Sequence, residues 1–310
     1  MDKPSIAVDV GATNTRVALV SPEGEIVKKV MSRTRVEGPD PMTIARDVIE
    51  KIYSILEAAD VRNLRGIGIS TAGPVDLRSG AIISPPNMPY PYVPLVQPIS
   101  EHFGLPVRLV NDARAGVLGE VWFGGGKGFQ NVVYITISTG IGGGAFVNGR
   151  LLLGSDGNAA EVGHMIVETC YNLRCGCGLY GHWEAYASGR TIPTFFRVWC
   201  ESEGDSPAGM ETAQSIFVAA RRDDPLALRF LEELGRINGR GISNVIVAYN
   251  PEVIILDGAV VQSNADQVMP YLEKYIDRYL RVPELRKSPL RGEAPLLGAA
   301  VLAGRGPGEI

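Results

Sequence analysis

The chain has little of what membrane-spanning and nucleic-acid-binding proteins need. Its 310 residues contain no apolar stretch of membrane-spanning length, and the opening residues Met1 to Pro4 lack the apolar core of a signal peptide. The net charge is −4 and there is no long run of Lys or Arg, so neither a nucleic-acid face nor a polybasic membrane patch is indicated. We therefore expect a cytoplasmic protein whose partner is a small molecule, with no nucleic-acid or membrane partner.

Cysteine and histidine are also scarce, with four Cys and three His in the whole chain, yet they are clustered. Three of the Cys and two of the His fall between Glu161 and Glu184. In this window His164, Cys175, Cys177 and His182 are ligands of the kinds that a tetrahedral Zn²⁺ site uses, and clustered thiols in a reducing compartment favour a metal over disulfides. The alternative is buried thiols beside satisfied core histidines, but such residues have no reason to cluster.

Two carboxylates bracket this window. Glu161 lies three residues before His164, on the same face if a helical turn forms there, so one ligand can touch both while a metal fixes the imidazole. With Glu184 at the other end, the window forms a wall suited to a polar, hydroxyl-rich molecule. The alternative is that either Glu is a solvated surface charge.

A pattern of strand, Gly/Thr turn and two further strands occurs twice. The first copy has strands at 5–10, 16–20 and 26–33, and the second at 132–138, 145–147 and 150–153. The first turn holds Gly11, Ala12, Thr13 and Asn14 just after Asp9, and the second begins with Thr139 and Gly140. Backbone N–H groups of such turns can approach a phosphate, and an Asp at a strand end can hold a metal ion through water. Either turn alone would also fit an ordinary β-hairpin.

The repeat indicates a duplicated α/β fold, in which each half has three antiparallel strands followed by helix-linked parallel strands. We place the halves at residues 1–123 and 124–310, because the glycine-rich run 124–128 interrupts the chain there. Two such turns facing one another can grip one polyphosphate from both sides. Helices are expected at 42–60, 113–122, 185–199, 212–222, 226–248 and 266–280, and the segment 296–303 is expected to pack on the second half.

Polar residues also follow several predicted strands. Asn111 and Asp112 come directly after the strand 107–110, at the carboxyl end where open α/β sheets bind ligands, although Asp112 is equally suited to cap the next helix. Asn87 lies in a proline-rich loop, and its amide can both donate to and accept from a sugar hydroxyl. Gly258, between a predicted strand and helix, suits a contact with adenosine.

Taken together, these motifs resemble the ROK family of sugar kinases and repressors. They are, in chain order, Asp9-x-Gly11-x-Thr13, Pro86-Asn87, Asn111-Asp112, Ser138-Thr139-Gly140-x-Gly142-Gly143-Gly144, Glu161-x-x-His164 and Cys175-x-Cys177-Gly-x-x-Gly-His182-x-Glu184. The resemblance runs through nearly the whole chain, and the Glu, His and Cys window is its most specific part. It implies an actin/hexokinase-type ATPase fold, with two lobes that hold sugar and ATP between them.

The resemblance further implies an ATP-dependent hexose kinase, which transfers the γ-phosphate to a sugar hydroxyl, most often the 6-hydroxyl of glucose or a related hexose. Asp112 would be the general base. The other sugar hydroxyls would be held by Gly73, Asn87, Asn111, Glu161, His164 and Glu184. Asp9 would bind Mg²⁺ through water, and the phosphates would be held by Gly11, Ala12, Thr13, Asn14, Thr139 and Gly140, with Gly258 near the adenosine. The implied cofactors are ATP, Mg²⁺ and a structural Zn²⁺.

Two positions depart from the family pattern. His182 stands where a third Cys is usual, so the expected zinc ligands are His164, Cys175, Cys177 and His182. The sequence Leu256-Asp257-Gly258-Ala259 stands where consecutive glycines are common, which leaves the nucleotide preference open.

Several alternatives belong to other classes. A kinase for N-acetylmannosamine or N-acetylglucosamine differs only in what it recognises at carbon 2 of the sugar. A ROK repressor would carry a helix-turn-helix before the first strand, for which a strand beginning at Ser5 leaves no room. A non-catalytic sugar sensor would not need Asp112 and both phosphate turns. The family also implies a homodimer or a dimer of dimers.

Overall fold

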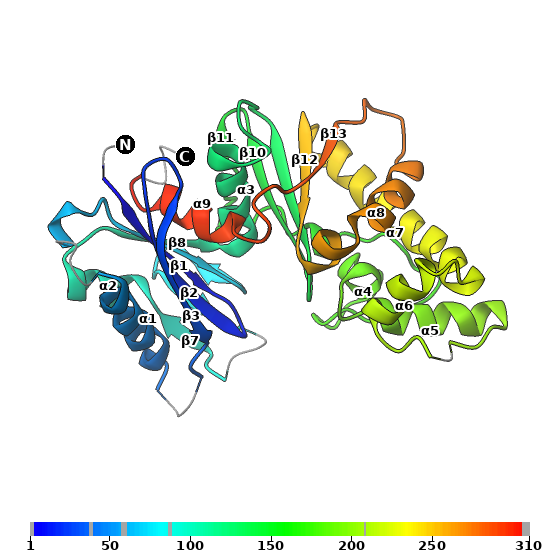
Figure 1. Cartoon of the computed structure of the whole chain (residues 1–310), viewed down its shortest axis with the longest axis horizontal. Helices are drawn as coiled ribbons and strands as arrows, with labels where there is room; N and C mark the ends of the chain where they lie inside the picture. The colour runs from blue at the N-terminus through cyan, green and yellow to red at the C-terminus, as the bar shows by residue number, and fades with distance from the viewer. Residues whose placement is uncertain (1–2, 37–39, 57–60, 86–88, 208, 306–310) are drawn as a thin grey trace. The chain divides into compact units, whose positions relative to one another are not determined.

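The structure is a computed structural model that describes residues 3–36, 40–56, 61–85, 89–207 and 209–305. Contacts within the chain group it into two compact units (Figure 1). Unit 1 comprises Met1–Val132, Gly144–Ala159 and Glu293–Ile310, and unit 2 comprises Val133–Gly143 and Ala160–Gly292. The halves predicted at 1–123 and 124–310 follow the sequence repeat rather than these contacts, and they stay a prediction. Within the described ranges, no helix combines the length and the apolar character needed to cross a membrane.

Unit 1 is built on a five-stranded sheet. Its strands are β1 (Ser5–Val10), β2 (Asn14–Val20), β3 (Ile26–Arg33), β4 (Ile67–Thr71) and β8 (Val107–Asn111), in the order β3-β2-β1-β4-β8. Strands β1 to β3 pair antiparallel, whereas β4 and β8 run parallel to β1, as predicted for the first half. A smaller sheet contains β5 (Val75–Asp76), β6 (Ala81–Ile83) and β7 (Tyr92–Pro94), and a short 3₁₀ turn spans Val61–Asn63.

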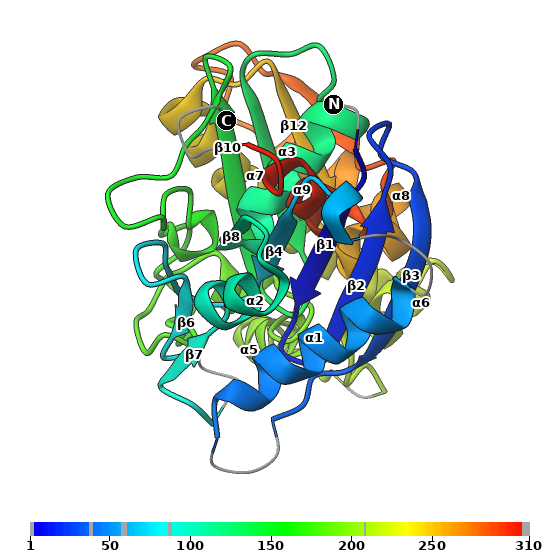
Figure 2. The same ribbon diagram turned by 90° about the vertical axis from the view of Figure 1, so that its left-hand side faces the viewer.

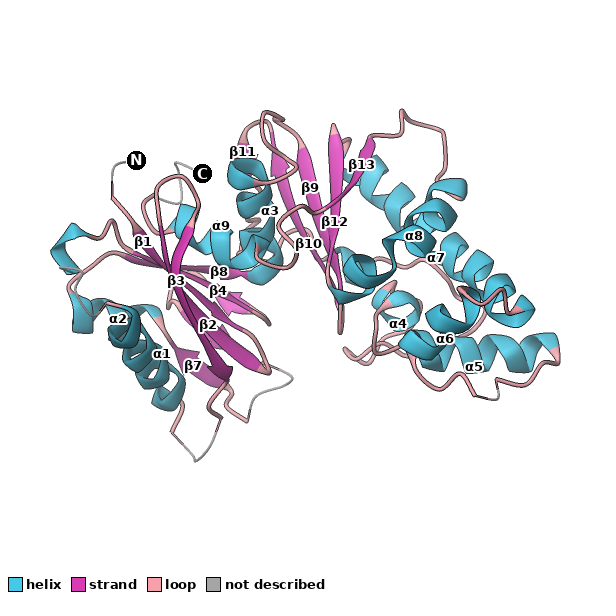
Figure 3. Cartoon of the chain, in the orientation of Figure 1, coloured by secondary structure: helices cyan, strands magenta, loops and turns pink. Residues whose placement is uncertain are grey.

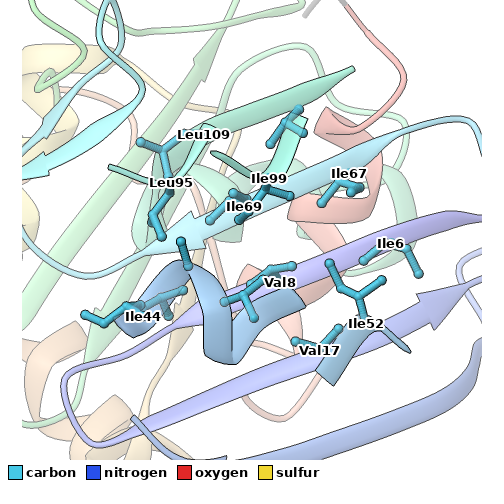
Figure 4. Packing of buried hydrophobic residues seen from close by; sticks show 14 of the residues in the cluster. Ile6, Val8, Val17, Ile44, Ile52, Ile67, Ile69, Leu95, Ile99 and Leu109 are labelled. Atoms are coloured by element: carbon cyan, nitrogen blue, oxygen red, sulfur yellow. The ribbon is translucent and has the colours of Figure 1, made fainter. Parts of the chain in front are cut away.

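Helices cover both faces of this sheet. On one face lie α1 (Met42–Ile55) and α2 (Val96–Phe103), and on the other lie α3 (Asp112–Phe123) and α9 (Ala294–Leu302) (Figure 2). The apolar positions Ile44, Val48 and Ile52 recur every four residues along α1, so they point to one side and pack on the buried strand residues (Figure 4). α1 ends at Ile55 rather than reaching residue 60, and residues 57–60 lie outside the described part.

The prediction that segment 296–303 packs on the second half is wrong, because α9 packs on α3 and on strands β1 and β4 of unit 1 (Figure 1). Glycines make this possible. A Cβ at Gly298 would lie 1.7 Å from the Ala115 carbonyl oxygen, and one at Gly68 would lie 1.8 Å from the Ala299 carbonyl oxygen. The backbones touch directly, which a side chain at either glycine would prevent.

A second sheet repeats the plan of the first. Its strands are β9 (Val132–Ile137), β10 (Ile141–Val147), β11 (Arg150–Leu151), β12 (Val253–Asp257) and β13 (Glu284–Lys287), in the order β11-β10-β9-β12-β13. The third, second, first, fourth and fifth strands of each set are neighbours, so the predicted duplication is confirmed. By the bounds given above, β11 and the end of β10 belong to unit 1, and most of the remaining sheet belongs to unit 2. Unit 2 contains a 3₁₀ turn (Val162–His164), α4 (Glu184–Ala187), α5 (Ile192–Glu203), α6 (Ala213–Ala220), α7 (Pro225–Tyr249) and α8 (Ala259–Lys274) (Figure 3).

Two predicted helices of unit 2 differ from the structure. The helix expected at 185–199 is interrupted between α4 and α5, where the chain turns so that the Gly189 N–H donates to the Ser138 carbonyl oxygen at 2.7 Å. The helix expected at 266–280 is α8, which begins at Ala259 and ends at Lys274. Asn264 leaves helical backbone angles there and its side-chain amide donates to the Val260 carbonyl oxygen, so a kink interrupts the apolar periodicity.

Candidate functional site

The structure brings together the four residues predicted as zinc ligands. One ligand atom from each of His164, Cys175, Cys177 and His182 lies within 4.8 Å of the others. Nδ1 of His182 is 3.2 Å from Nδ1 of His164 and 3.3 Å from Sγ of Cys177, and Sγ of Cys175 is 3.9 Å from Nδ1 of His164. Cys170, the remaining cysteine of the window Glu161 to Glu184, is exposed and does not belong to this group.

These separations fit a tetrahedral zinc ion. Bonds of about 2.05 Å to nitrogen and 2.3 Å to sulfur require ligand atoms about 3.3 Å apart for two nitrogens and about 3.6 Å apart for nitrogen and sulfur. Burial lowers the pKa of His182, and the neighbouring His164 lowers it further, which favours the neutral imidazole that binds a metal. Burial also raises the pKa of the Cys175 thiol to about 11, so a metal must displace its proton to bind.

Local hydrogen bonds shape the turn that carries the two thiols. The Cys175 N–H donates to the Leu179 carbonyl oxygen at 2.7 Å, and the Gly178 N–H donates to the Cys175 carbonyl oxygen at 2.9 Å. Gly178 has a φ of 93°, which glycine adopts readily. A β-bridge joins Ile166 to His182 and so carries the second histidine to the first.

Two neighbouring side chains anchor this window to α7. Trp183 is fully buried, and its indole N–H donates to the Asn238 side-chain oxygen at 2.9 Å. Glu168 accepts from the N–H groups of Thr169 and Cys170, each at 2.7 Å, and forms an ion pair with Arg240. Burial alone would raise the pKa of Glu168, but these backbone N–H groups and the guanidinium outweigh it and hold the pKa below its usual value.

The two carboxylates that bracket the window differ in setting. Glu161 is exposed and precedes the 3₁₀ turn Val162–His164, so it lies one short turn from His164. Glu184 is half-buried at the start of α4, and its Oε2 accepts from the backbone N–H of Ile141 at 2.9 Å. Glu184 therefore contacts the Gly/Thr turn of unit 2.

That turn lies close to the glycine at the start of α8. Ser138 N–H donates to the Gly140 carbonyl oxygen at 2.8 Å and closes the turn, while Thr139 is exposed. Gly258 has a φ of 90°, and a Cβ there would lie 2.4 Å from the Ile137 carbonyl oxygen. The turn and the amino end of α8 therefore adjoin, and the amino end of a helix is a place where backbone N–H groups can bind an anion.

In unit 1, the first Gly/Thr turn joins β1 to β2. The Gly11 N–H donates to the Asn14 carbonyl oxygen at 2.9 Å, while Ala12 is half-buried and Thr13 and Asn14 are exposed. Just before the turn, Asp9 accepts from the Arg16 Nε at 2.9 Å and from the Ser70 hydroxyl at 2.8 Å. The guanidinium and the hydroxyl hold the Asp9 carboxylate in a fixed orientation beside the turn.

Two polar residues, Asn111 and Asp112, lie where strand β8 meets helix α3, and only the first is needed to cap the helix. Asn111 is the N-cap of α3, and its side-chain oxygen accepts from the Ala113 N–H at 2.9 Å. Asp112 is the first helical residue and is half-buried, and its Oδ1 lies 2.8 Å from the same N–H. Capping therefore does not depend on Asp112. Gly73 follows β4 with a φ of 94°, and Asn87 lies outside the described residues.

The sequence profile of the ROK family matches residues 5–305 of the chain. The chain belongs to the ROK family. It is 37% identical to a glucokinase of Thermotoga maritima over 309 residues, which is 95% of each protein. Two solved ROK structures have the same fold, and these likenesses confirm the actin/hexokinase-type ATPase fold.

The first of these structures is a ROK family glucokinase from Streptomyces griseus in complex with glucose and AMPPNP. It is 30% identical, with a TM-score of 0.79, and the match covers 98% of this chain and all of that one. The second is a ROK family transcriptional regulator, a homologue of the Escherichia coli MLC protein, at 27% identity and a TM-score of 0.82. That match covers 97% of this chain and 78% of the regulator.

Three residues that shape these ROK motifs, Arg16, Ser70 and Ile141, could not be recognised from the motifs themselves. Arg16 is the direct cross-strand partner of Asp9 in the β1–β2 pairing. Its ion pair with Asp9 could therefore have been predicted from the register of the hairpin. Ser70 reaches Asp9 from the neighbouring strand β4, which no local pattern reveals. The bond from Ile141 to Glu184 joins residues 43 positions apart and likewise has no local signal.

Proposed function

We propose that this ROK protein is an ATP-dependent hexose kinase that transfers the γ-phosphate of ATP to a hydroxyl of glucose or a related hexose, most often the 6-hydroxyl. The observation that carries the proposal is the likeness, over nearly the full length of both proteins, to a glucokinase and to a glucokinase structure that holds glucose and an ATP analogue. The residues that we propose for catalysis and phosphate binding are distributed over both units.

Asp112 acts in this proposal as the general base that accepts the proton of the attacking hydroxyl. Its place at the carboxyl end of a parallel strand is where such sheets present groups to ligands. Asn111, Glu161, His164 and Glu184 hold the remaining hydroxyls, together with Gly73 and Asn87. His164 directs Nδ1 at the other cluster residues, which leaves Nε2 for a sugar hydroxyl.

Phosphoryl transfer depends mainly on alignment and charge neutralisation. The turns Gly11–Asn14 and Thr139–Gly140 hold the phosphates, and Gly258 approaches the adenosine. Mg²⁺, when bound with ATP, neutralises phosphate charge, and Asp9 is the proposed residue that holds it through water. Zn²⁺ is the proposed occupant of the cluster His164, Cys175, Cys177 and His182, where it fixes the imidazole of His164.

A coupled assay that detects ADP, run with Mg·ATP and a panel of sugars, tests the function. We expect the highest kcat/KM with glucose and lower values with mannose, N-acetylglucosamine and N-acetylmannosamine. A maximum on an N-acetyl sugar would select the alternative of an N-acetylhexosamine kinase. No turnover on any hexose, with sugar binding intact, would instead favour a non-catalytic sugar sensor. The likeness to a ROK transcriptional regulator is the observation that supports this second candidate.

We also propose that the enzyme works in the cytoplasm as a homodimer or a dimer of dimers. Light scattering of the purified protein, with and without sugar, tests the assembly. A monomer at every concentration would contradict it.

A further inference from the structure

Glu184 holds the phosphate turn of unit 2 through a bond that its predicted sugar-binding role does not require. Its Oε2 accepts from the Ile141 N–H at 2.9 Å, and a Cβ at Gly140 would lie only 2.4 Å from the same oxygen. The carboxylate thus lies against the backbone of the turn, and a side chain at position 140 would displace it. The Glu184 side chain is 17% exposed, so water competes little for this bond.

A second bond ties the other side of the turn to the same short segment. Gly189 N–H donates to the Ser138 carbonyl oxygen at 2.7 Å, and a Cβ at Gly189 would lie 2.9 Å from that oxygen. Thr191 closes the segment, because its hydroxyl donates to the Glu184 carbonyl oxygen at 2.6 Å. The stretch from Glu184 to Gly189 therefore holds the turn Ser138–Ile141 at both ends.

This stretch begins two residues after a member of the metal cluster. His182 and Glu184 flank Trp183, whose buried indole is fixed by Asn238, so the three residues are held as one rigid piece. On the other side, the second carboxylate oxygen, Oε1, lies 4.0 Å from Sγ of Cys175 and 3.8 Å from a guanidinium nitrogen of Arg190. A shift of the cluster would reach the phosphate turn through Glu184.

We infer that Glu184 is a positioning residue for the nucleotide, which sets the phosphate turn and couples it to the metal cluster. The inference rests on the proposed function, because it takes the phosphates of ATP as the ligand of this turn. The turn needs an oxygen acceptor at this position, but it does not need a negative charge, which would repel phosphate. Oε1 pairs with Arg190 at 3.8 Å rather than with the turn, so a sugar hydroxyl that binds Glu184 would share this oxygen with the guanidinium.

Substitutions at Glu184 separate the acceptor from the charge. We expect Glu184→Ala to weaken AMPPNP binding, measured by calorimetry without sugar, by roughly 10- to 100-fold, the range for a hydrogen bond to a charged group. Glu184→Gln keeps an oxygen that can accept from Ile141, so it should retain most of the nucleotide affinity while the KM for sugar rises. The control is Glu161→Ala, which should raise the KM for sugar and leave AMPPNP affinity unchanged. Unchanged AMPPNP affinity in Glu184→Ala, or a Gln variant as weak as the Ala variant, would overturn the inference.

A double-mutant cycle tests the contact itself. Gly140→Ala alone should weaken AMPPNP binding because its Cβ meets the carboxylate, but it should add little in the Glu184→Ala background, where that clash is gone. Strictly additive effects would overturn the inference.

Hydrogen exchange gives a readout that does not depend on the nucleotide. The Ile141 amide should exchange faster in Glu184→Ala than in the wild type, at equal zinc content by elemental analysis. If wild-type protein fails to bind AMPPNP, the proposed function is wrong, while exchange at Ile141 still decides whether Glu184 positions the turn. Unchanged exchange there would refute the positioning role.

Discussion

Replacing Asp112 by Asn separates two roles that a carboxylate at the start of a helix can have. Asn111 already caps α3, and an Asn at position 112 still offers an oxygen to the Ala113 N–H. The structural loss is then limited to one negative charge in the first turn, worth about 0.3–1 kcal/mol against the helix dipole. We expect the melting temperature to fall by no more than about 4 °C.

The chemical loss should be much larger. Removing a general base lowers kcat by about 10²- to 10⁴-fold, which corresponds to about 2.7–5.4 kcal/mol in the barrier. We expect this fall in kcat with a nearly unchanged KM for glucose, measured in the coupled assay and supported by calorimetric sugar binding. The expected loss of stability and the expected rise of the barrier do not overlap, so the two effects of the substitution can be told apart.

A matched control exists in α7. Asp224 is the N-cap of that helix, and its Oδ1 accepts from the N–H groups of Leu226 and Ala227 at 3.0 and 2.9 Å. Asp224→Asn should cost a similar stability and leave kcat at the wild-type value. If Asp112→Asn keeps kcat within about threefold of the wild type, Asp112 serves only the helix and the proposed mechanism fails.

Three further predictions concern the metal cluster and the packing. His182→Ala should lower the zinc content per chain and His182→Cys should restore it, because a thiolate is an equally competent ligand. Full zinc in the Ala variant, by elemental analysis, would show that His182 is not a ligand. Glu168→Gln should destabilise the protein by about 1–3 kcal/mol at pH 7. Because the folded pKa of Glu168 is lowered, this difference is present above the unfolded pKa near 4.5 and disappears as the pH falls through the folded pKa, which urea titrations at pH 7 and at pH 4 or below can measure. A difference that persists at low pH would contradict the ionic role. Gly298→Ala should cost about 3 kcal/mol, since its Cβ would lie 1.7 Å from the Ala115 carbonyl oxygen, and a melting curve like that of the wild type would disprove this close packing.

The sequence could predict features whose signal is local. Strand β3 was expected at 26–33 and spans Ile26–Arg33, and the turn residues Pro22 to Glu25 mark its start. The metal cluster was expected because its thiols and imidazoles lie within a short stretch, and a tight turn brings neighbours together whatever the rest of the chain does.

Features that depend on distant contacts could not be predicted. The break between α4 and α5 exists because Gly189 bonds to Ser138, some fifty positions earlier. The placement of α9 depends on Gly298 in α9 and Gly68 in β4, which meet only in the folded unit. The apolar character of segment 296–303 does not indicate which surface it will cover. The second function of Glu184 was hidden for the same reason, since a single carboxylate shows nothing of its distant partner.

The packing of α9 has a consequence for the order of events during synthesis. Of the two helices on its face of the sheet, α3 follows β4 closely, but α9 is made more than 220 residues after β4. At about 5–20 residues per second, the part of β1 and β4 that α9 covers stays uncovered for on the order of ten seconds or more. Unit 2 is contained within the intervening sequence and can fold during this interval. Unit 1 can therefore complete its packing only after the residues of unit 2 have been made.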